Sequence, residues 1–378
     1  MKQQSVHVPA QPTPASCYIY PTCEISSVDL GPFFQEKGVV IGEEPTDDQR
    51  EVASVINRMC RKHGFVHVTN FGMSMQFAQR FFAASEELFD PARTGKYEPW
   101  SPATNTGFSS YRNESLNRNR PPDLKEAFNV RFPPKWENPS LPKTPQSFQS
   151  LIDEYTRIMK TASMRYGLIC ALALELPLDT FTKQLNTYNL CTARFLHYPS
   201  CDFHDSVSAS AGIDEAIRVG EHTDFGVFTF LLLRSGQGPM GLQIRAGERG
   251  GACGGKAGGE ECGWMDVIVA KSEEKDEANA SSFGAIINTG SMMARMTNDY
   301  WKATPHRVIV PTAECARTDR YSIAFFVDPD IDEMIEVQEK YKDSDDASEG
   351  PCATYHEPIS SMDFILAKLK EMADAGKA

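Results

Sequence analysis

Residues 220–233 read GEHTDFGVFTFLLL, a short polar segment that leads into an apolar run. The run Val227–Leu233 consists of valine, aromatic, threonine and leucine residues, and this composition predicts a buried β-strand. In an extended chain, residues i and i+2 face the same side, so His222 and Asp224 can reach one ion while Thr223 faces away. The stretch therefore predicts two metal ligands at the mouth of a buried strand.

A third ligand is expected from another strand further along the chain. His306 lies in the motif TPHRV and opens the apolar run 307–310, while Arg320 opens the run 321–327. Polar residues at the mouths of buried strands are typical of a barrel whose open end holds a ligand. Two imidazoles and one carboxylate on one face of an octahedral ion leave three positions free, which is the ligand set of non-haem Fe(II) oxygenases. The pattern predicts a metal site formed by His222, Asp224 and His306.

Further motifs accompany these strands in a fixed order. Arg194 is followed by Tyr198-Pro199, Asn288-Thr289-Gly290 precedes His306, and Arg320-x-Ser322 comes last. Three segments lie upstream: Ile25 to Leu30, Cys60 to Gly72 and Asp123 to Phe128. In this order the motifs resemble the Fe(II)/2-oxoglutarate-dependent dioxygenases of the isopenicillin N synthase-like superfamily, over roughly residues 25–372.

The resemblance implies a fold and an activity. The fold would be α+β with a mainly β core, a double-stranded β-helix (jelly roll) with flanking helices. The activity would be that of an oxidoreductase that uses Fe(II), dioxygen and 2-oxoglutarate to hydroxylate or desaturate a small organic substrate, with release of succinate and carbon dioxide. Ascorbate would be a further cofactor that such enzymes accept.

The resemblance also assigns residues to roles. His222, Asp224 and His306 would be the catalytic metal ligands. Arg320 would bind the distal carboxylate of 2-oxoglutarate through its planar guanidinium, with Ser322 and Tyr198 completing the clamp. Five residues fall where family members line the substrate pocket: Phe108, Tyr111, Phe128, Arg194 and Phe326.

The sequence differs from the family pattern at two positions, and two other functions are compatible with the same motifs. Ser291 stands where the family usually has Asp, and Leu196 stands where some plant members have Asn. One alternative is a non-haem iron oxidase that does not use 2-oxoglutarate, of the isopenicillin N synthase or aminocyclopropane-carboxylate oxidase type. The other is a non-catalytic member that binds a metal or a small ligand.

Composition and charge exclude several other classes. The chain has 378 residues and a formal charge of 38 − 51 = −13, which argues against a general binder of nucleic acid or anionic membranes. No stretch approaches the roughly 18 apolar residues that a membrane span needs, and the first residues have no apolar segment typical of a secretory signal. The 10 cysteines form no CxxC pair. Together these features predict a cytoplasmic protein with free thiols.

The chain is predicted to consist of five regions. They are a flexible arm (1–24), an amino-terminal dioxygenase region (25–145), a helical support (146–190), the double-stranded β-helix core (191–335) and a carboxy-terminal helical segment (336–378). The glycine-rich stretch 245–263 and the charged stretch 271–282 are expected to be surface loop insertions, peripheral to the chemistry.

Periodicity and capping signals predict individual elements. Helices are expected at 47–62, with Thr46 and Gln49 as a capping box, at 75–90 and at 145–176. A helix with an apolar face that includes Leu366 and Leu369 is expected near the carboxy terminus, after a capping box at Ser360 and Asp363. Residues 99–144 are expected to be long loops. Strands are expected at 65–69, 192–198, 227–233, 241–244, 264–269, 285–288, 308–310 and 321–327.

Overall fold

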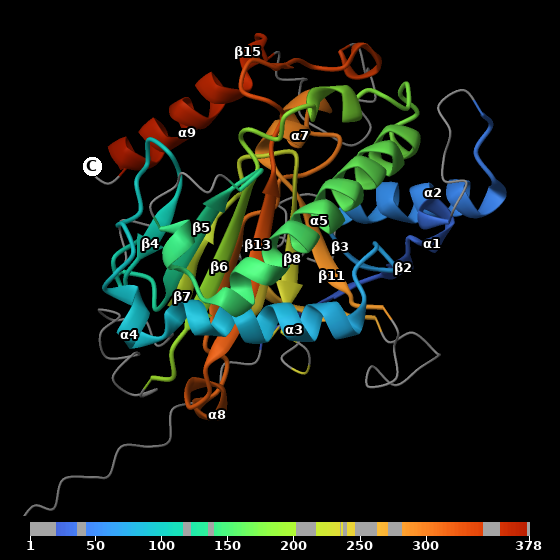
Figure 1. The fold of residues 1–378 in the computed structure, drawn as a ribbon. Helices are drawn as coiled ribbons and strands as arrows, with labels where there is room; N and C mark the ends of the chain where they lie inside the picture. The colour runs from blue at the N-terminus through green and yellow to red at the C-terminus, as the bar shows by residue number, and fades with distance from the viewer. Residues whose placement is uncertain are drawn as a thin grey trace, which may run out of the picture.

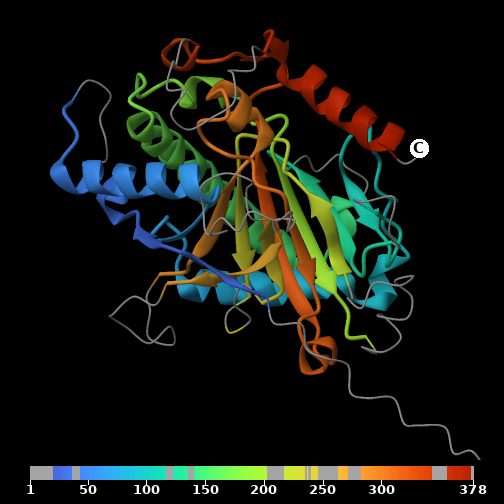
Figure 2. The same cartoon turned by 180° about the vertical axis from the view of Figure 1, so that it is seen from behind.

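Two β-sheets face each other and form the centre of the molecule (Figures 1 and 2). The computed structural model describes residues 20–35, 43–115, 122–134, 140–201, 217–234, 236, 240–245, 263–270, 282–342 and 356–375. The larger sheet has the strand order β2-β3-β11-β8-β13-β6-β5-β4 and the smaller sheet has the order β1-β10-β9-β12-β7. This is the double-stranded β-helix that the resemblance implies, so the predicted fold class is confirmed.

The strands of the larger sheet are β2 (Ser27–Asp29), β3 (Phe65–Thr69), β4 (Gly107–Ser109), β5 (Glu126–Arg131), β6 (Thr192–Tyr198), β8 (Phe228–Leu233), β11 (Ala285–Thr289) and β13 (Arg320–Val327). Those of the smaller sheet are β1 (Thr22–Ile25), β7 (Ile217–His222), β9 (Leu242–Arg245), β10 (Trp264–Val269) and β12 (His306–Ile309). A short pair, β14 (Met334–Ile335) and β15 (Ile359–Ser360), stands apart from both.

Alternation along the strands divides the apolar side chains between two cores. On β13, Ile323, Phe325 and Val327 belong to the core beneath the helices, whereas Ala324 and Phe326 belong to the core between the two sheets. Because side chains alternate along a strand, Arg320 and Ser322 share the face of Ala324 and point between the sheets. The period of two therefore places these polar residues inside the barrel.

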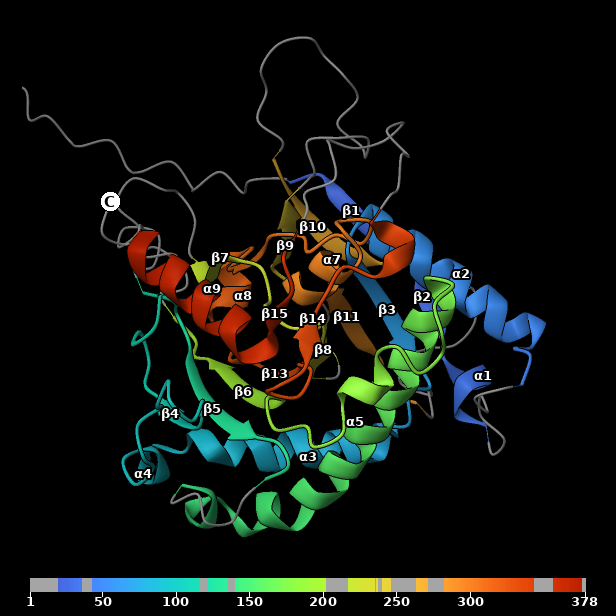
Figure 3. The ribbon, with the colours of Figure 1, turned by 90° about the horizontal axis from the view of Figure 1, so that it is seen from above.

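Helices cover the outer face of the larger sheet (Figure 3). α5 (Gln146–Ala173) is the longest, and α2 (Asp47–Lys62) and α3 (Met75–Glu86) pack beside it. α9 (Ser361–Ala375) lies over another part of the molecule, beside β15. The remaining helical segments are short: α1 (Gly31–Phe34), α4 (Pro91–Thr94), α7 (Ser291–Met296), α8 (Ala313–Ala316) and the 3-10 turns 87–89, 141–143, 182–184 and 339–341.

The helix predicted at 47–62 is confirmed together with its cap. The Thr46 hydroxyl accepts a hydrogen bond from the Gln49 N–H at 3.2 Å, and the Gln49 side chain accepts one from the Thr46 N–H at 2.9 Å. The apolar face of α2, including Val52, Ile56 and Met59, is buried in the helix-side core. Only half of the capping box predicted at Ser360 and Asp363 is found: the Asp363 N–H donates to the Ser360 hydroxyl at 3.1 Å, but that hydroxyl, rather than the Ser360 N–H, donates to the Asp363 carboxylate at 2.7 Å.

We expect Thr46→Ala to destabilise the protein by about 1 kcal/mol, because it removes the acceptor for an N–H at the start of α2 that has no partner within the helix. Urea unfolding should show a lower midpoint with an unchanged slope. An unchanged midpoint would contradict the role of this cap.

Two predictions about the amino-terminal half are wrong. Residues 99–144 are not only loops, because they contain β4 and β5, and β5 pairs with β6 along its whole length. Residues 22–24 do not belong to a flexible arm, because β1 pairs in parallel with β10 and Cys23 is buried. These strands lack a strong pattern of their own, and pairing with neighbours distant in sequence stabilises them. Strands β1 to β5 thus share the two sheets with the strands after residue 191.

Three other elements differ from the sequence prediction. β7 was not expected, and it carries His222 at its last position. The helix expected at 75–90 ends at Glu86 and continues as a 3-10 turn. On α9, Leu366 and Leu369 are 54% and 39% exposed, whereas Phe364 is buried in the core and Ile365 packs against it. Most of the two predicted insertions, residues 246–262 and 271–281, lies outside the described residues.

Among the helices in the described ranges, none is long and apolar enough to cross a membrane.

Candidate metal centre and cosubstrate site

The three predicted metal ligands meet at one end of the space between the sheets. His222 is the last residue of β7, His306 is the first of β12, and the two are direct partners in the β7–β12 pairing. Asp224 lies two residues beyond β7, so it stands in the connection to β8 rather than on an extended strand as predicted. One ligand atom from each residue lies within 4.8 Å of the other two. The Asp224 Oδ1 is 3.7 Å from the His222 Nε2 and 3.9 Å from the His306 Nε2.

Hydrogen bonds orient each of these side chains for metal binding. The Nδ1 atoms of His222 and His306 lie 2.8 and 3.1 Å from the carbonyl oxygens of Gly220 and Thr304. A carbonyl only accepts, so each Nδ1 carries the hydrogen and each Nε2 presents its lone pair toward Asp224. Burial and then the neighbouring His306 lower the pKa of His222 to about 3, which keeps it neutral and able to bind a cation at neutral pH.

The carboxylate of Asp224 is held by two residues that sequence reasoning missed. Its Oδ2 accepts hydrogen bonds from the Thr229 hydroxyl at 2.6 Å and from the Asn288 amide at 2.7 Å, which leaves Oδ1 facing the histidines. Burial raises the pKa of Asp224, but the two histidines and these donors outweigh it and lower the pKa. The sequence could have indicated both residues: Thr229 is the one polar residue in the apolar run 227–233, and Asn288 opens the motif Asn288-Thr289-Gly290.

Arg320 is buried in the barrel with its hydrogen-bonding groups unused. The side chain is only 3% exposed, and its guanidinium carbon is 4.9 Å from the centroid of the Tyr198 ring, its cross-strand partner. Among the described residues, neither its three nitrogens nor the Ser322 hydroxyl has a hydrogen-bond partner. An unpaired buried charge is costly, by several kcal/mol or more. The site therefore fits an anion, and a guanidinium fork beside a hydroxyl suits a carboxylate.

The five residues predicted to line the substrate pocket lie in three different places. Arg194 shares the inner face with Leu196 and Tyr198, and Phe326 packs against the core between the sheets. Tyr111 follows β4 and is 39% exposed. Phe108 and Phe128 pair across β4 and β5 and pack on Tyr97 in the core beneath the helices, so the structure does not bring them together with Arg194 and Phe326. On β5 the side chain facing inward is that of Ala127.

A buried ionic network lies beside the metal ligands, and the sequence did not reveal it. Glu114 forms ion pairs with Arg194 and with Lys125, whose Nζ is 2.8 Å from its carboxylate and 3.1 Å from that of Asp123. Asp123 in turn accepts the Gly220 N–H at 2.9 Å, on the strand that carries His222. Burial raises the pKa of Glu114, but Arg194 and Lys125 outweigh it and lower the pKa to about 2, so the carboxylate is charged.

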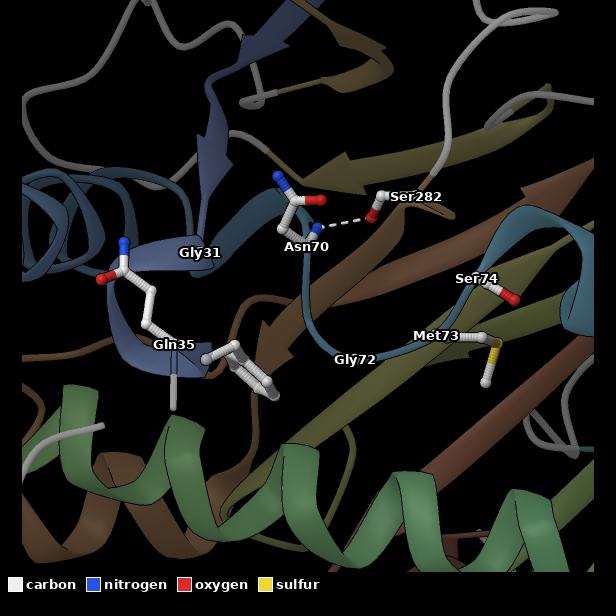
Figure 4. A pocket seen from close by; sticks show the side chains of 8 residues that line it. Gly31, Gln35, Asn70, Gly72, Met73, Ser74 and Ser282 are labelled. Carbon is white, nitrogen blue, oxygen red and sulfur yellow. Dashed lines mark hydrogen bonds between the residues drawn. The ribbon is translucent and has the colours of Figure 1, made fainter. Parts of the chain in front are cut away.

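A cavity on another part of the surface lacks the groups needed for chemistry. It lies between α1 and the connection from β3 to α3, where the Asn70 N–H donates to the Ser282 hydroxyl at 2.8 Å (Figure 4). None of its lining residues is a histidine, cysteine, aspartate or glutamate. The barrel end therefore remains the candidate active site.

Two imidazoles and a carboxylate brought together in a jelly roll match the ligand set of non-haem iron oxygenases. Comparison with known proteins agrees with this class: over most of its length the chain is similar to Fe(II)/2-oxoglutarate-dependent dioxygenases. Residues 25–150 match the family model described as the N-terminal region of non-haem dioxygenases in morphine synthesis. The protein is an enzyme that uses Fe(II) and 2-oxoglutarate.

Individual relatives agree over most of the chain. A 2-oxoglutarate-Fe(II) type oxidoreductase of Aspergillus fumigatus is 27% identical over 83% of this chain and 88% of its own. The 2-oxoglutarate-dependent dioxygenase citB of Monascus ruber is 26% identical over 82% of this chain and 85% of its own. The crystal structure of Neurospora crassa T7H in complex with alpha-KG has a similar fold, with a TM-score of 0.69 and 22% identity, covering 92% of this chain and 96% of that one.

Proposed function

We propose that His222, Asp224 and His306 hold the Fe(II) ion and that Arg320 with Ser322 binds the distal carboxylate of 2-oxoglutarate. The observation that carries this proposal is the buried guanidinium of Arg320, which lies against Tyr198 and has no hydrogen-bond partner among the described residues. Bound Fe(II) and 2-oxoglutarate supply the activation of dioxygen that oxidises the substrate, with release of succinate and carbon dioxide.

The protein residues orient these groups and exclude water. Gly220 and Thr304 accept the Nδ1 hydrogens and so direct each Nε2 inward. Tyr198 lies against the guanidinium of Arg320 and limits its rotation, so that the fork is already placed for a planar carboxylate. Both Arg320 and Ser322 are buried, which strengthens their interaction with an anion because water does not screen it.

The substrate in this proposal is a small organic molecule that is hydroxylated or desaturated beside the metal. Phe326 offers an apolar contact on the inner face of the larger sheet, and the ion pair of Arg194 with Glu114 offers a polar one, each side chain of the pair being 17–18% exposed. We place the enzyme in the cytoplasm, where its cysteines stay reduced.

The experiment that tests this function is the measurement of succinate from 2-oxoglutarate by the purified protein, with and without Fe(II). Formation of succinate only with Fe(II) is the expected result. Iron binding without any affinity for 2-oxoglutarate would instead favour an iron oxidase that does not use this cosubstrate. No iron binding at all would favour a non-catalytic ligand-binding protein.

Replacing the residues that hold Asp224 should weaken the metal site without removing it. Asn288→Leu and Thr229→Val each leave the Oδ2 of Asp224 with one donor fewer, and we expect iron affinity to fall by about 10- to 100-fold. Competition titration with a chelator would measure this loss. Thr289→Val, at the next position on β11, is the matched control and should keep the wild-type affinity. Equal affinity in all variants would contradict the positioning role.

A further inference from the structure

A second buried guanidinium, that of Arg218, lies near the ring of Tyr198, which Arg320 also contacts. Arg218 is on β7 and is 3% exposed. The guanidinium carbon of Arg218 is 5.8 Å from the centroid of the Tyr198 ring. The guanidinium carbon of Arg320 is 4.9 Å from the same centroid. The β7–β12 pairing shifts register between Val308 and Ile309, opposite the place of Arg218. Such an irregularity redirects a side chain, which accounts for the contact of Arg218 with Tyr198.

The two arginines place uncompensated positive charge in a buried space. Within the described ranges, neither forms an ion pair with a carboxylate, and none of the three nitrogens of Arg320 has a hydrogen-bond partner. The Nη2 of Arg218 donates to the carbonyl oxygens of Cys315 at 3.1 Å and of Thr318 at 3.4 Å, while its Nε has no hydrogen-bond partner in the described parts of the chain. Burial, and then the charge of Arg320, lowers the pKa of Arg218, as expected for two cations that repel each other. Carbonyl dipoles cannot neutralise this pair, and an anion can.

We propose that Arg218 is a second binding residue for the distal carboxylate of 2-oxoglutarate, which would lie between Arg218 and Arg320. This inference rests on the proposed function. A carboxylate has about four lone-pair sites. The fork of Arg320 takes two of them, and the Ser322 hydroxyl and the Nε–H of Arg218 can take the others. The pair would select 2-oxo acids that end in a second carboxylate.

The competing explanation is that Arg218 has a structural role only and holds the segment 315–318 in place by donating hydrogen bonds to two of its carbonyl oxygens. That role would affect the shape of the site for every ligand. A role in binding the distal carboxylate affects only ligands that have one. The two explanations therefore differ in how the affinity changes with the ligand.

The test is the Arg218→Gln variant, which keeps an amide N–H for the carbonyl groups and removes the charge. Arg165→Gln is the matched control, because Arg165 also donates to a backbone carbonyl, that of Phe33, and lies 5.5 Å from the centroid of an aromatic ring, that of Phe34, but on α5. Calorimetry without oxygen would measure binding of 2-oxoglutarate and of 2-oxopentanoate, which lacks the distal carboxylate, to the Fe(II)-loaded proteins.

For Arg218→Gln we expect 2-oxoglutarate affinity to fall about tenfold or more, with iron stoichiometry and 2-oxopentanoate affinity unchanged. The Arg165→Gln protein should match the wild type for both ligands. Unchanged 2-oxoglutarate affinity in Arg218→Gln, or an equal loss for both ligands, would overturn the inference. If Arg218→Gln does not fold, Arg218→Lys is measured in its place. The ratio of its affinity for 2-oxoglutarate to its affinity for 2-oxopentanoate should also fall below that of the wild type, but by less than expected for Arg218→Gln. A wild-type protein that does not bind 2-oxoglutarate would overturn the proposed function itself.

Discussion

Purified His306→Ala and Asp224→Ala proteins should each lose bound iron, whereas the wild type should hold about one Fe(II) per chain. Each substitution leaves only two protein donors, and no other histidine, cysteine or acidic residue of the described chain completes a cluster of three with them. Succinate formation should disappear together with the metal. Elemental analysis after dialysis, combined with the succinate assay, would measure both quantities.

A matched control separates loss of a ligand from loss of a buried histidine. His67 on β3 is partly buried and lies 2.8 Å from the Ser27 hydroxyl, outside the cluster of ligands. His67→Gln should therefore keep its iron. Iron contents equal to that of the wild type in both ligand variants would show that the metal binds elsewhere.

The second large effect is expected for Arg320. Arg320→Met removes the buried cation and both arms of its fork, so 2-oxoglutarate affinity should fall by about 100-fold or more, because each hydrogen bond to a charged group contributes about 1.5–3 kcal/mol. Arg320→Lys keeps the charge without the fork and should still cost more than about 1 kcal/mol of binding free energy. Calorimetric titration of the Fe(II)-loaded proteins with 2-oxoglutarate would measure these losses.

Iron binding distinguishes this prediction from the first. Arg320 does not belong to the cluster of ligands, so both variants should retain the metal content of the wild type. Arg165→Met removes a guanidinium far along α5 and should leave both affinities unchanged. If Arg320→Met binds 2-oxoglutarate as tightly as the wild type, the clamp assignment is wrong.

The sequence predicted strongly patterned elements well. Thr46 and Gln49 lie next to each other on one helical turn, so the start of α2 follows from local hydrogen bonds alone. The apolar runs of β8 and β13 also specify strands locally. By contrast, β1, β5 and β7 were missed, because their residues form strands through pairing with β10, β6 and β12, which are distant in sequence.

For the candidate site, the sequence identified the residues with distinctive chemistry and the order in which they occur. His222, Asp224, His306 and Arg320 could be chosen because imidazole, carboxylate and guanidinium at the mouths of strands have few other uses. Only the tertiary structure decided which neighbouring residues contact and orient these four side chains. Phe128 faces the helices because Ala127 takes the inward position, and Arg218 reaches Tyr198 because the pairing of β7 is irregular. The face of the sheet on which a side chain lies, and the register of each strand, depend on pairing between distant segments, which the sequence pattern of one strand does not specify.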